Sequence, residues 1–453
     1  MKHFAALALA FFAGCAQVPL GEAPDVPPPV RLDFPQVSSF AGRSPGPATR
    51  PNAEIARDFL DLAFELESGR PVPRLTRFDE PITVRLVGPI GPVARRDLAA
   101  LLARLRSEAR IDIRMTTRDT ANIVIEAVPS RTLSRVAPNA ACFVVPRVQS
   151  WSELRAARGT AILDWTTLER RDRAAIFVPS DATPQETRDC LHEELAQALG
   201  PLNDLYRLPD SVFNDDNIHA VLTGFDMLVL RAFYDPALRN GMSRDDVAAR
   251  IPAILARLNP RGQRDASGFA SKTTPEWKRE MENALTDRLS NRRRRLAALR
   301  AIDIGEARGW TGTRAGFAQY AYGRLQIAND PSAALGAFSI ANRAYAQAPE
   351  TRLHNGFISV QLAAFALMSG NADATIAITE NAIPVVRSHE NAALLALLMM
   401  FQAEALDFKG DTEAGTKVRM DSLGWALYGF GSREEVVDRL NEIASLPPDT
   451  PPS

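Results

Sequence analysis

The chain has 453 residues, of which 46% are hydrophobic and 24% are charged. This is a globular composition, and it excludes a wholly disordered, collagen-like or coiled-coil chain. Lys and Arg number 53 and Asp and Glu number 54, which gives a formal net charge of −1. A protein that neutralises many phosphates needs a basic surface, so this balance argues against nucleic acid as the partner. At about 150 residues per domain, the length predicts about three units, or two and a linker.

The first residues predict export. A lysine precedes an apolar run from Phe4 to Ala13, which has the length of a secretory hydrophobic region and is shorter than the ~20 residues that span a bilayer. The run ends in Phe12-Ala13-Gly14-Cys15, which resembles the lipobox of bacterial lipoproteins except that phenylalanine replaces the usual leucine. We interpret residues 1–14 as a lipoprotein signal peptide and Cys15 as the lipidation site. A soluble periplasmic protein is the alternative.

The lipid on Cys15 is the expected membrane anchor, because no later segment is long and apolar enough to span a bilayer. The predicted location is the periplasmic face of a bacterial membrane in the cell envelope, the outer membrane rather than the inner. Residues 15–53 are rich in proline and poor in large apolar side chains, so we expect an extended tether.

Two further cysteines, Cys142 and Cys190, form an even pair in a compartment that favours oxidation. We expect a disulfide between them, and in the chain-entropy model the closed loop stabilises the fold by about 4 kcal/mol. Two free buried thiols are the alternative. If Cys15 is lipidated and Cys190 is bonded, no free thiolate remains to act as a nucleophile.

Residues 54–255 predict an α+β domain, with a mixed sheet packed on helices. Alternating or short apolar runs indicate strands at 82–87, 122–128 and 175–178. Apolar residues at helical spacing indicate helices at 53–67 and 93–109.

Thr183-Pro184-Gln185-Glu186 is a capping box with proline at the first helical position, and it predicts a helix that ends at Gly200. The second half of this helix, from Cys190, looks like a zincin helix without its zinc ligands. Zincin chemistry needs two histidines at i and i+4, with a glutamate beside the first as general base. If His192 is the first ligand, the second position holds Ala196, which excludes a metal in that register.

The better register places Glu193 and Gln197 at the first two ligand positions and Glu194 at the position of the catalytic base. The third ligand position then holds Asn203, with Asp204 next. Zinc prefers histidine nitrogen or thiolate, so we expect no metal and no activity at these degenerate positions. Zinc or calcium is the alternative, although a calcium site needs more carboxylates.

Four segments carry a resemblance to a known family. They are Glu193–Gly200 with Asn203-Asp204, Ser211–Asp215, Phe225–Pro236, and Gly241–Ser243. Together they resemble a family of uncharacterised proteobacterial lipoproteins, domain of unknown function 2927, over residues 54–255. The resemblance implies an exported lipoprotein with a zincin-like, metzincin-like shape and a degenerate motif, and it implies no substrate.

Residues 256–312 predict a helical connector, in which Arg292 to Arg295 form a solvated face. Residues 313–435 are alanine-rich and repeat: Ala334, Ala374 and Ala414 lie forty residues apart, each four residues after a break at Asp330, Gly370 or Gly410. This pattern predicts an all-α domain of stacked helical hairpins, similar to tetratricopeptide-like repeats, whose usual period is 34. Residues 436–453 predict a final helix and a proline-rich tail.

The leading functional interpretation is a membrane-anchored periplasmic lipoprotein that acts as a non-catalytic binding or scaffold protein. A protein or peptide partner at the helical repeats is expected, and a merely structural role for the repeats is the alternative. The rival function is a metal-dependent envelope peptidase with Glu194 as base and an atypical Glu/Gln/Asn site. Hydrolysis by the paired carboxylates Glu193 and Glu194 is disfavoured, because adjacent helical residues point about 100° apart.

Overall fold

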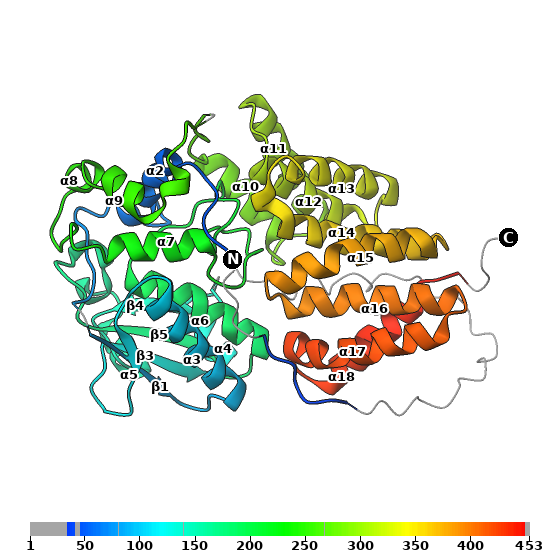
Figure 1. Ribbon diagram of the computed structural model, residues 1–453, viewed down its shortest axis with the longest axis horizontal. Coiled ribbons are helices and arrows are strands. Elements are labelled where there is room, and N and C mark those ends of the chain that lie inside the picture. The colour runs from blue at the N-terminus through cyan, green and yellow to red at the C-terminus, as the bar shows by residue number, and fades with distance from the viewer. Residues whose placement is uncertain (1–33, 41–45, 80, 139, 267, 449–453) are drawn as a thin grey trace.

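The computed structural model describes residues 34–40, 46–79, 81–138, 140–266 and 268–448. The expected signal peptide 1–14, the lipidation site Cys15 and much of the expected tether lie outside the described residues. Figure 1 shows a mixed α/β unit beside a unit built of helices. No helix in the described part of the chain has the length and apolar composition of a membrane span.

Among the described residues, five strands form one mixed sheet in the order β2-β1-β3-β5-β4. The strands are β1 (Ile82–Val87), β2 (Ile113–Met115), β3 (Ile123–Val128), β4 (Phe143–Pro146) and β5 (Ala174–Pro179). The first three and β5 run parallel, whereas β4 pairs antiparallel with β5 and forms one edge. The sequence pattern predicted β1, β3 and β5 but not β2 or β4, which are too short to show an alternating pattern.

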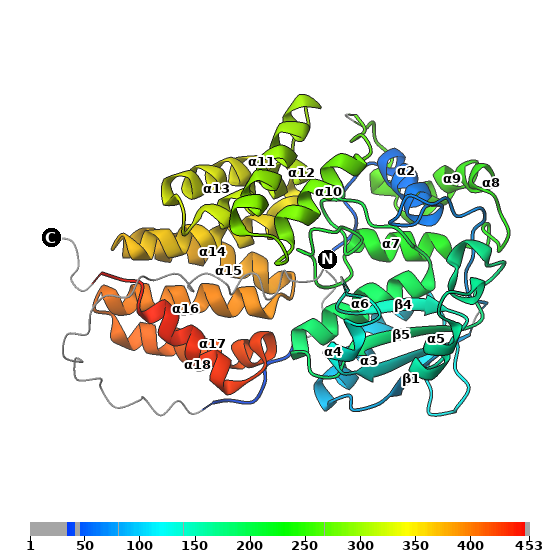
Figure 2. The ribbon, with the colours of Figure 1, turned by 180° about the vertical axis from the view of Figure 1, so that it is seen from behind.

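Helices cover both faces of this sheet (Figures 1 and 2). One face shares a core with α2 (Asn52–Ala63), α3 (Pro92–Ser107), α6 (Pro184–Leu199), α7 (Gly224–Phe233) and α9 (Ile251–Leu258). Ile123, Ile125 and Ile176 face this core. Ala175 and Phe177 face the opposite way, toward α4 (Ser130–Leu133) and α5 (Trp151–Ala157), because successive strand residues point to opposite faces. The short helix α8 (Arg244–Ala248) precedes α9.

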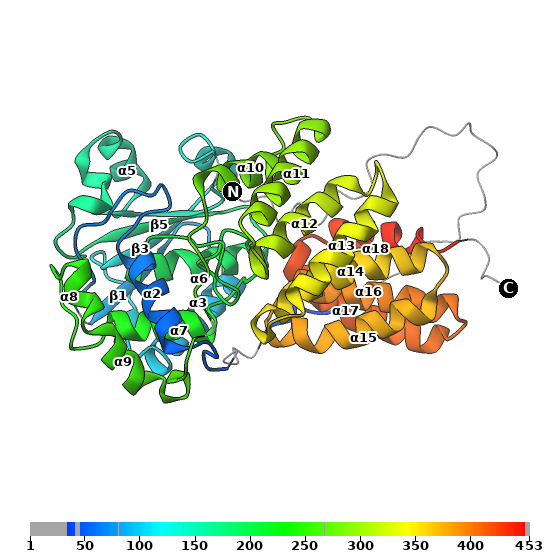
Figure 3. The ribbon, with the colours of Figure 1, turned by 90° about the horizontal axis from the view of Figure 1, so that it is seen from above.

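The rest of the described chain is helical. After the connector helices α10 (Pro275–Leu285) and α11 (Asn291–Ala307), consecutive helices pack as pairs (Figure 3). The pairs are α12 (Thr313–Gln326) with α13 (Pro331–Tyr345), α14 (Arg352–Met368) with α15 (Ala372–Ser388), and α16 (Ala392–Phe408) with α17 (Thr412–Phe430), followed by α18 (Arg433–Ala444).

Side-chain caps explain where the second helix of each pair begins. Asp330, Asn371 and Asp411 each accept a hydrogen bond from the backbone N–H three residues later. The preceding Gly370 and Gly410 have positive φ, at 73° and 85°, which a glycine adopts without steric cost. The breaks predicted at Asp330, Gly370 and Gly410 are therefore confirmed as helix boundaries.

Helix α6 also forms the interface between the two units. Arg188 makes a buried ion pair with Glu390, in the loop between α15 and α16. Gln185 donates to the side chain of Asn391 at 3.1 Å and accepts from the backbone N–H of Ala393 at 2.8 Å. These polar groups are buried in pairs, so the two units lie in one specific orientation.

Residues 34–40 of the expected tether pack against the helical unit. Ser38 donates its backbone N–H to the carbonyl of Gly424 in α17 at 3.0 Å, and the rings of Phe40 and Trp425 lie 4.5 Å apart. A Cβ at Gly424 would come within 2.3 Å of the Ser38 hydroxyl oxygen, so the close approach requires glycine. Residues 34–40 are thus held on α17 rather than extended away from the protein.

A disulfide joins Cys142, just before β4, to Cys190 in α6, and the two Cα atoms lie 5.9 Å apart. Both cysteines are buried. The bond ties the edge strand of the sheet to the helix that contacts the other unit.

Reduction of this disulfide is expected to lower the free energy of unfolding by about 4 kcal/mol, because the reduced unfolded chain gains conformational freedom. Urea denaturation of the protein with and without dithiothreitol measures the effect. A Cys142→Ala/Cys190→Ala double variant is the control and should not respond to the reductant. An unchanged midpoint on reduction of the wild-type protein would contradict the prediction.

Candidate functional site

A cavity of about 930 Å³ lies where the sheet edge, α6 and the connector meet. Residues 142–144 at the start of β4 form one wall, and Glu193, Glu194 and Gln197 of α6 form another. Helix α10 and residues 286–289 after it close the third side. Arg288 in this loop donates to the carbonyl of Pro138 at 3.3 Å, which ties the connector to the α/β unit.

The structure of α6 follows its sequence closely. The capping box between Thr183 and Glu186 is formed, with Pro184 at the first turn, as predicted. The helix ends at Gly200, where an added Cβ would lie 2.9 Å from the ring of Phe233. Glycine is needed here because α7 packs directly against the end of α6.

A buried arginine that the sequence did not indicate holds the end of α6. Arg171 donates to the carbonyls of Gln197 and Ala198, both at 2.6 Å, and to that of Gly200 at 2.5 Å. A cation at a helix C-terminus satisfies the last carbonyls and interacts favourably with the helix dipole. Burial lowers the pKa of Arg171 to about 10, so its guanidinium stays charged at neutral pH.

The loop after α6 is fixed to α2 by a buried ion network. Arg207 contacts Asp58 at 2.6 Å and Asp61 at 2.9 Å, and all three side chains are buried. Asp58 also pairs with Arg50 at 2.6 Å. Buried charges that are paired and hydrogen-bonded hold a single geometry, and this network fixes the loop that carries Asp204.

Of the four positions where a zincin would hold its metal, three line the cavity and Asn203 does not. Glu193, Gln197 and Asp204 line the cavity, and Gln197 donates its side-chain amide to Asp204 at 3.4 Å. Asn203 instead donates to the carbonyl of Asp61 at 3.0 Å, on α2. Across the described ranges, no group of three or more His, Cys, Asp or Glu side chains is arranged to hold a metal ion.

Two other residues considered from the sequence have defined places. Glu194, the expected base position, is buried and lines the cavity beside Glu193. His192 is also buried, and its Nδ1 accepts the backbone N–H of Leu222 at 3.0 Å. Burial lowers the pKa of His192 well below its usual value, so it is a neutral core residue.

The cavity is acidic to a degree that the sequence did not indicate. Glu67 and Asp215 reach it from loops far apart in the chain, and Glu282 and Asp287 reach it from the connector. The sequence suggested a local turn at residues 214–217, and Asn214 and Asp216 do cap backbone N–H groups there. Asp215 lies between them and borders the cavity.

Burial and neighbouring acids change the ionisation of two of these groups. Burial raises the pKa of Asp204 well above its usual value, and the nearby carboxylates of Glu67, Asp215 and Glu193 raise it further. Burial also raises the pKa of Asp215, to about 8, with Glu67 adding to the rise and Lys278 opposing it. Like charges held close together in a poorly solvated site favour a bound proton.

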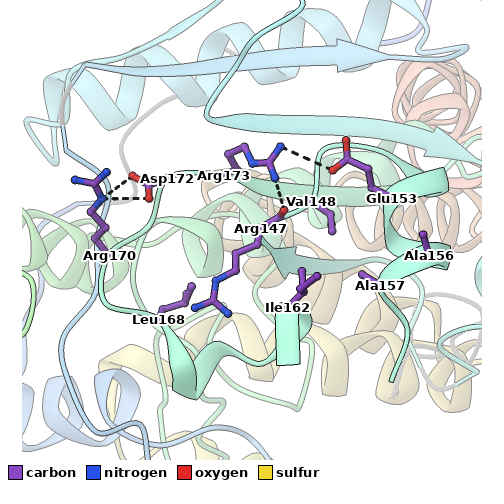
Figure 4. Close-up of a pocket in the computed structure, with 10 residues that line it drawn as sticks. All are labelled: Arg147, Val148, Glu153, Ala156, Ala157, Ile162, Leu168, Arg170, Asp172 and Arg173. Atoms are coloured by element: carbon purple, nitrogen blue, oxygen red, sulfur yellow. Dashed lines mark hydrogen bonds and ion pairs between the residues drawn. The ribbon is translucent and has the colours of Figure 1, made fainter. Parts of the chain in front are cut away.

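A second cavity, of about 530 Å³, lies beside α5 and β5 and has a different character (Figure 4). Its arginines are engaged within the protein: Arg170 pairs with Asp172 at 2.9 Å, and Arg147 donates to the carbonyl of Thr167 at 2.8 Å. Arg173 lies 3.9 Å from Glu153 and donates to the carbonyl of Arg147. We therefore take the acidic cavity as the candidate functional site.

Replacing Arg171 with alanine is expected to lower the free energy of unfolding by about 3 kcal/mol or more, because three buried carbonyls lose their donor. Urea denaturation measures the change. Arg170→Ala is the matched control, and its exposed ion pair should contribute less than about 1 kcal/mol. Equal effects of the two substitutions would show that Arg171 does not cap α6.

The raised pKa of Asp215 predicts a pH-dependent stability. In the folded protein this pKa is about 8, above the unfolded value of about 3.9. The contribution of Asp215 to the free energy of unfolding is therefore full below about pH 4 and is lost as the pH rises to about 8. Asp215→Asn, which is neutral throughout, should flatten the fall. Denaturation midpoints from about pH 5 to about pH 9 test this, and parallel profiles for the two proteins would contradict it.

No curated protein and no solved structure matches the chain. One protein family does match part of the chain. The match covers the α/β unit from the first residue of α2 into α9, and it agrees with the family resemblance found in the sequence. Residues 52–253 match the family described as protein of unknown function (DUF2927).

Proposed function

We propose that this protein is a non-catalytic binding protein whose ligand site is the acidic cavity between the α/β unit and the connector. One observation carries the proposal: the side chain at the third ligand position, Asn203, bonds to the backbone of α2 and does not line the cavity. Gln197 bonds to Asp204 and Asn203 bonds to Asp61. The helix that would hold a catalytic metal in a zincin thus forms one wall of a cavity large enough for a ligand.

The edge strand β4 supports an extended peptide as the ligand. It forms the end of the sheet, and its residues Phe143 and Val144 border the cavity. A strand at a sheet edge offers backbone groups to which an extended segment of another protein can add. The disulfide at Cys142 holds this edge beside α6.

The same proposal includes a zincin-like domain and a tetratricopeptide-like helical array. A mixed five-stranded sheet packed on helices, with α6 beside the edge strand, supports a zincin-like domain. Consecutive helix pairs between residues 313 and 430 support a tetratricopeptide-like array. Such arrays bind segments of other proteins, so the repeats are a second protein-binding surface in this proposal.

We also propose a lipid anchor at Cys15 on the periplasmic face of a bacterial membrane, the outer rather than the inner. The lipobox-like residues Phe12 to Cys15 and the Cys142–Cys190 disulfide support this location, because disulfides persist in oxidising compartments.

A metal-dependent envelope peptidase is the second candidate. Glu194 favours it, since this carboxyl group is buried and borders the cavity beside Glu193 and Gln197. A general base in a peptidase needs such a place next to its substrate.

Elemental analysis of the mature protein, purified without chelator, distinguishes the two functions. We expect less than one equivalent of any transition metal, and no peptide cleavage by either the wild-type protein or Glu194→Gln, because the proposed role needs no base. Glu193→Ala is the control for metal content. One equivalent of metal that is lost in Glu193→Ala, with peptide cleavage that is lost in Glu194→Gln, would establish the peptidase instead.

A further inference from the structure

Acidic side chains outnumber basic ones around the acidic cavity. In the described part of the chain, seven acidic side chains and two basic ones, Lys278 and Arg288, line its wall. A concave site lined by one sign of charge focuses the electrostatic potential and attracts ligands of the opposite sign. The smaller cavity of Figure 4 differs, because three arginines and two acids line it.

Asp204 is the second and independent sign of a ligand. Its side chain borders the cavity, the residue is only 3% exposed, and its Oδ1 has no hydrogen-bond partner among the described residues. Buried carboxylate oxygens without a donor are rare, because each loses its hydration without compensation. Glu67, Glu193 and Asp215 act electrostatically on the same group. The cavity wall therefore contains a buried carboxyl oxygen that no described donor satisfies.

The connector supplies positive charge to the cavity from within the protein. Lys278 of α10 borders the cavity and stabilises the charged form of Asp215. This residue shows that an ammonium group is accommodated beside these acids. Lys278 and Arg288 are still outnumbered by the seven acidic side chains of the wall.

We infer that the cavity binds a primary ammonium or guanidinium group, carried by a lysine or arginine in an extended peptide segment. This inference rests on the proposed binding function and specifies its ligand. An organic cation fits better than a metal ion, because the described acids are not arranged to coordinate one. The apolar residues Leu66, Phe143 and Leu202 also line the cavity and can pack against the aliphatic stem of such a side chain.

Three heptapeptides test the inference: acetyl-Val-Thr-Lys-Val-Lys-Thr-Val-amide and its analogues with glutamine or glutamate in place of both lysines. Calorimetric titration into the full mature protein at low salt should show the lysine peptide binding about tenfold more tightly than the glutamine peptide. The glutamate peptide should bind more weakly still. Added salt should reduce the preference for lysine.

Two variants test whether this cavity is the part of the protein that recognises the charge of the peptide. At about pH 9, above the pKa of about 8 of Asp215, Asp215→Asn should weaken binding of the lysine peptide about fivefold or more and leave binding of the glutamine peptide unchanged. Lys278→Met should strengthen binding of the lysine peptide, since it removes the internal cation; a merely disruptive substitution would weaken it. Glu169→Gln is the control, because that side chain is 86% exposed and outside the cavity, and it should change nothing.

The outcomes separate this inference from the proposed function. Equal affinity for the lysine and glutamine peptides would overturn the cationic ligand and leave a binding protein. Hydrolysis of the peptides, detected by mass spectrometry, would overturn the binding function itself. Binding of spermidine or calcium alone, sensitive to Asp215→Asn, with no peptide bound would show a site for a small cation and overturn the peptide assignment. Failure of all these probes would overturn the inference.

Discussion

The structure depends on the burial of α6, a helix that carries many polar side chains into the interior. A buried helix of this kind is stable only if each polar group finds a partner. Its two ends meet this requirement in different ways. Arg171 satisfies the carbonyls at the C-terminal end, and the N-terminal half pairs with the loop between α15 and α16 through Arg188 and Gln185. Because both units contact this one helix, its polar partners set how they are oriented.

The cavity follows from the same arrangement. The disulfide holds β4 beside α6, and the ion network around Arg207 holds the loop after α6 against α2. Side chains from these fixed elements point into the space that α10 then covers. The cavity is therefore bounded by rigid elements, which suits a site that binds a ligand without large rearrangement.

Burying several carboxylates together is costly, and proteins keep such clusters where a proton or a cation compensates them. Here Asp204 and Asp215 retain protons more readily than isolated acids do. Lys278 compensates only part of the charge from within. This electrostatic imbalance supports the proposed binding role, because carboxylates that do not hold a metal can hold an organic cation.

The sequence by itself determined the local structure. Strong periodicity predicted β1, β3, β5 and most helices, and the capping box at Thr183 predicted where α6 begins. These features depend on residues close together in the chain, so they can be recognised from a pattern. The repeat in the helical part gave its helix boundaries for the same reason.

Only the tertiary structure decided which residues form the site. Glu67, Asp215 and Lys278 lie on three distant segments that carry no shared motif. They meet because the loop after α2, the loop before α7 and α10 surround one cavity beside α6. The same holds for Arg171, whose partners lie 26 to 29 positions later in the chain. Packing over long separations brings these charges together, and charge interactions act through space rather than along the sequence.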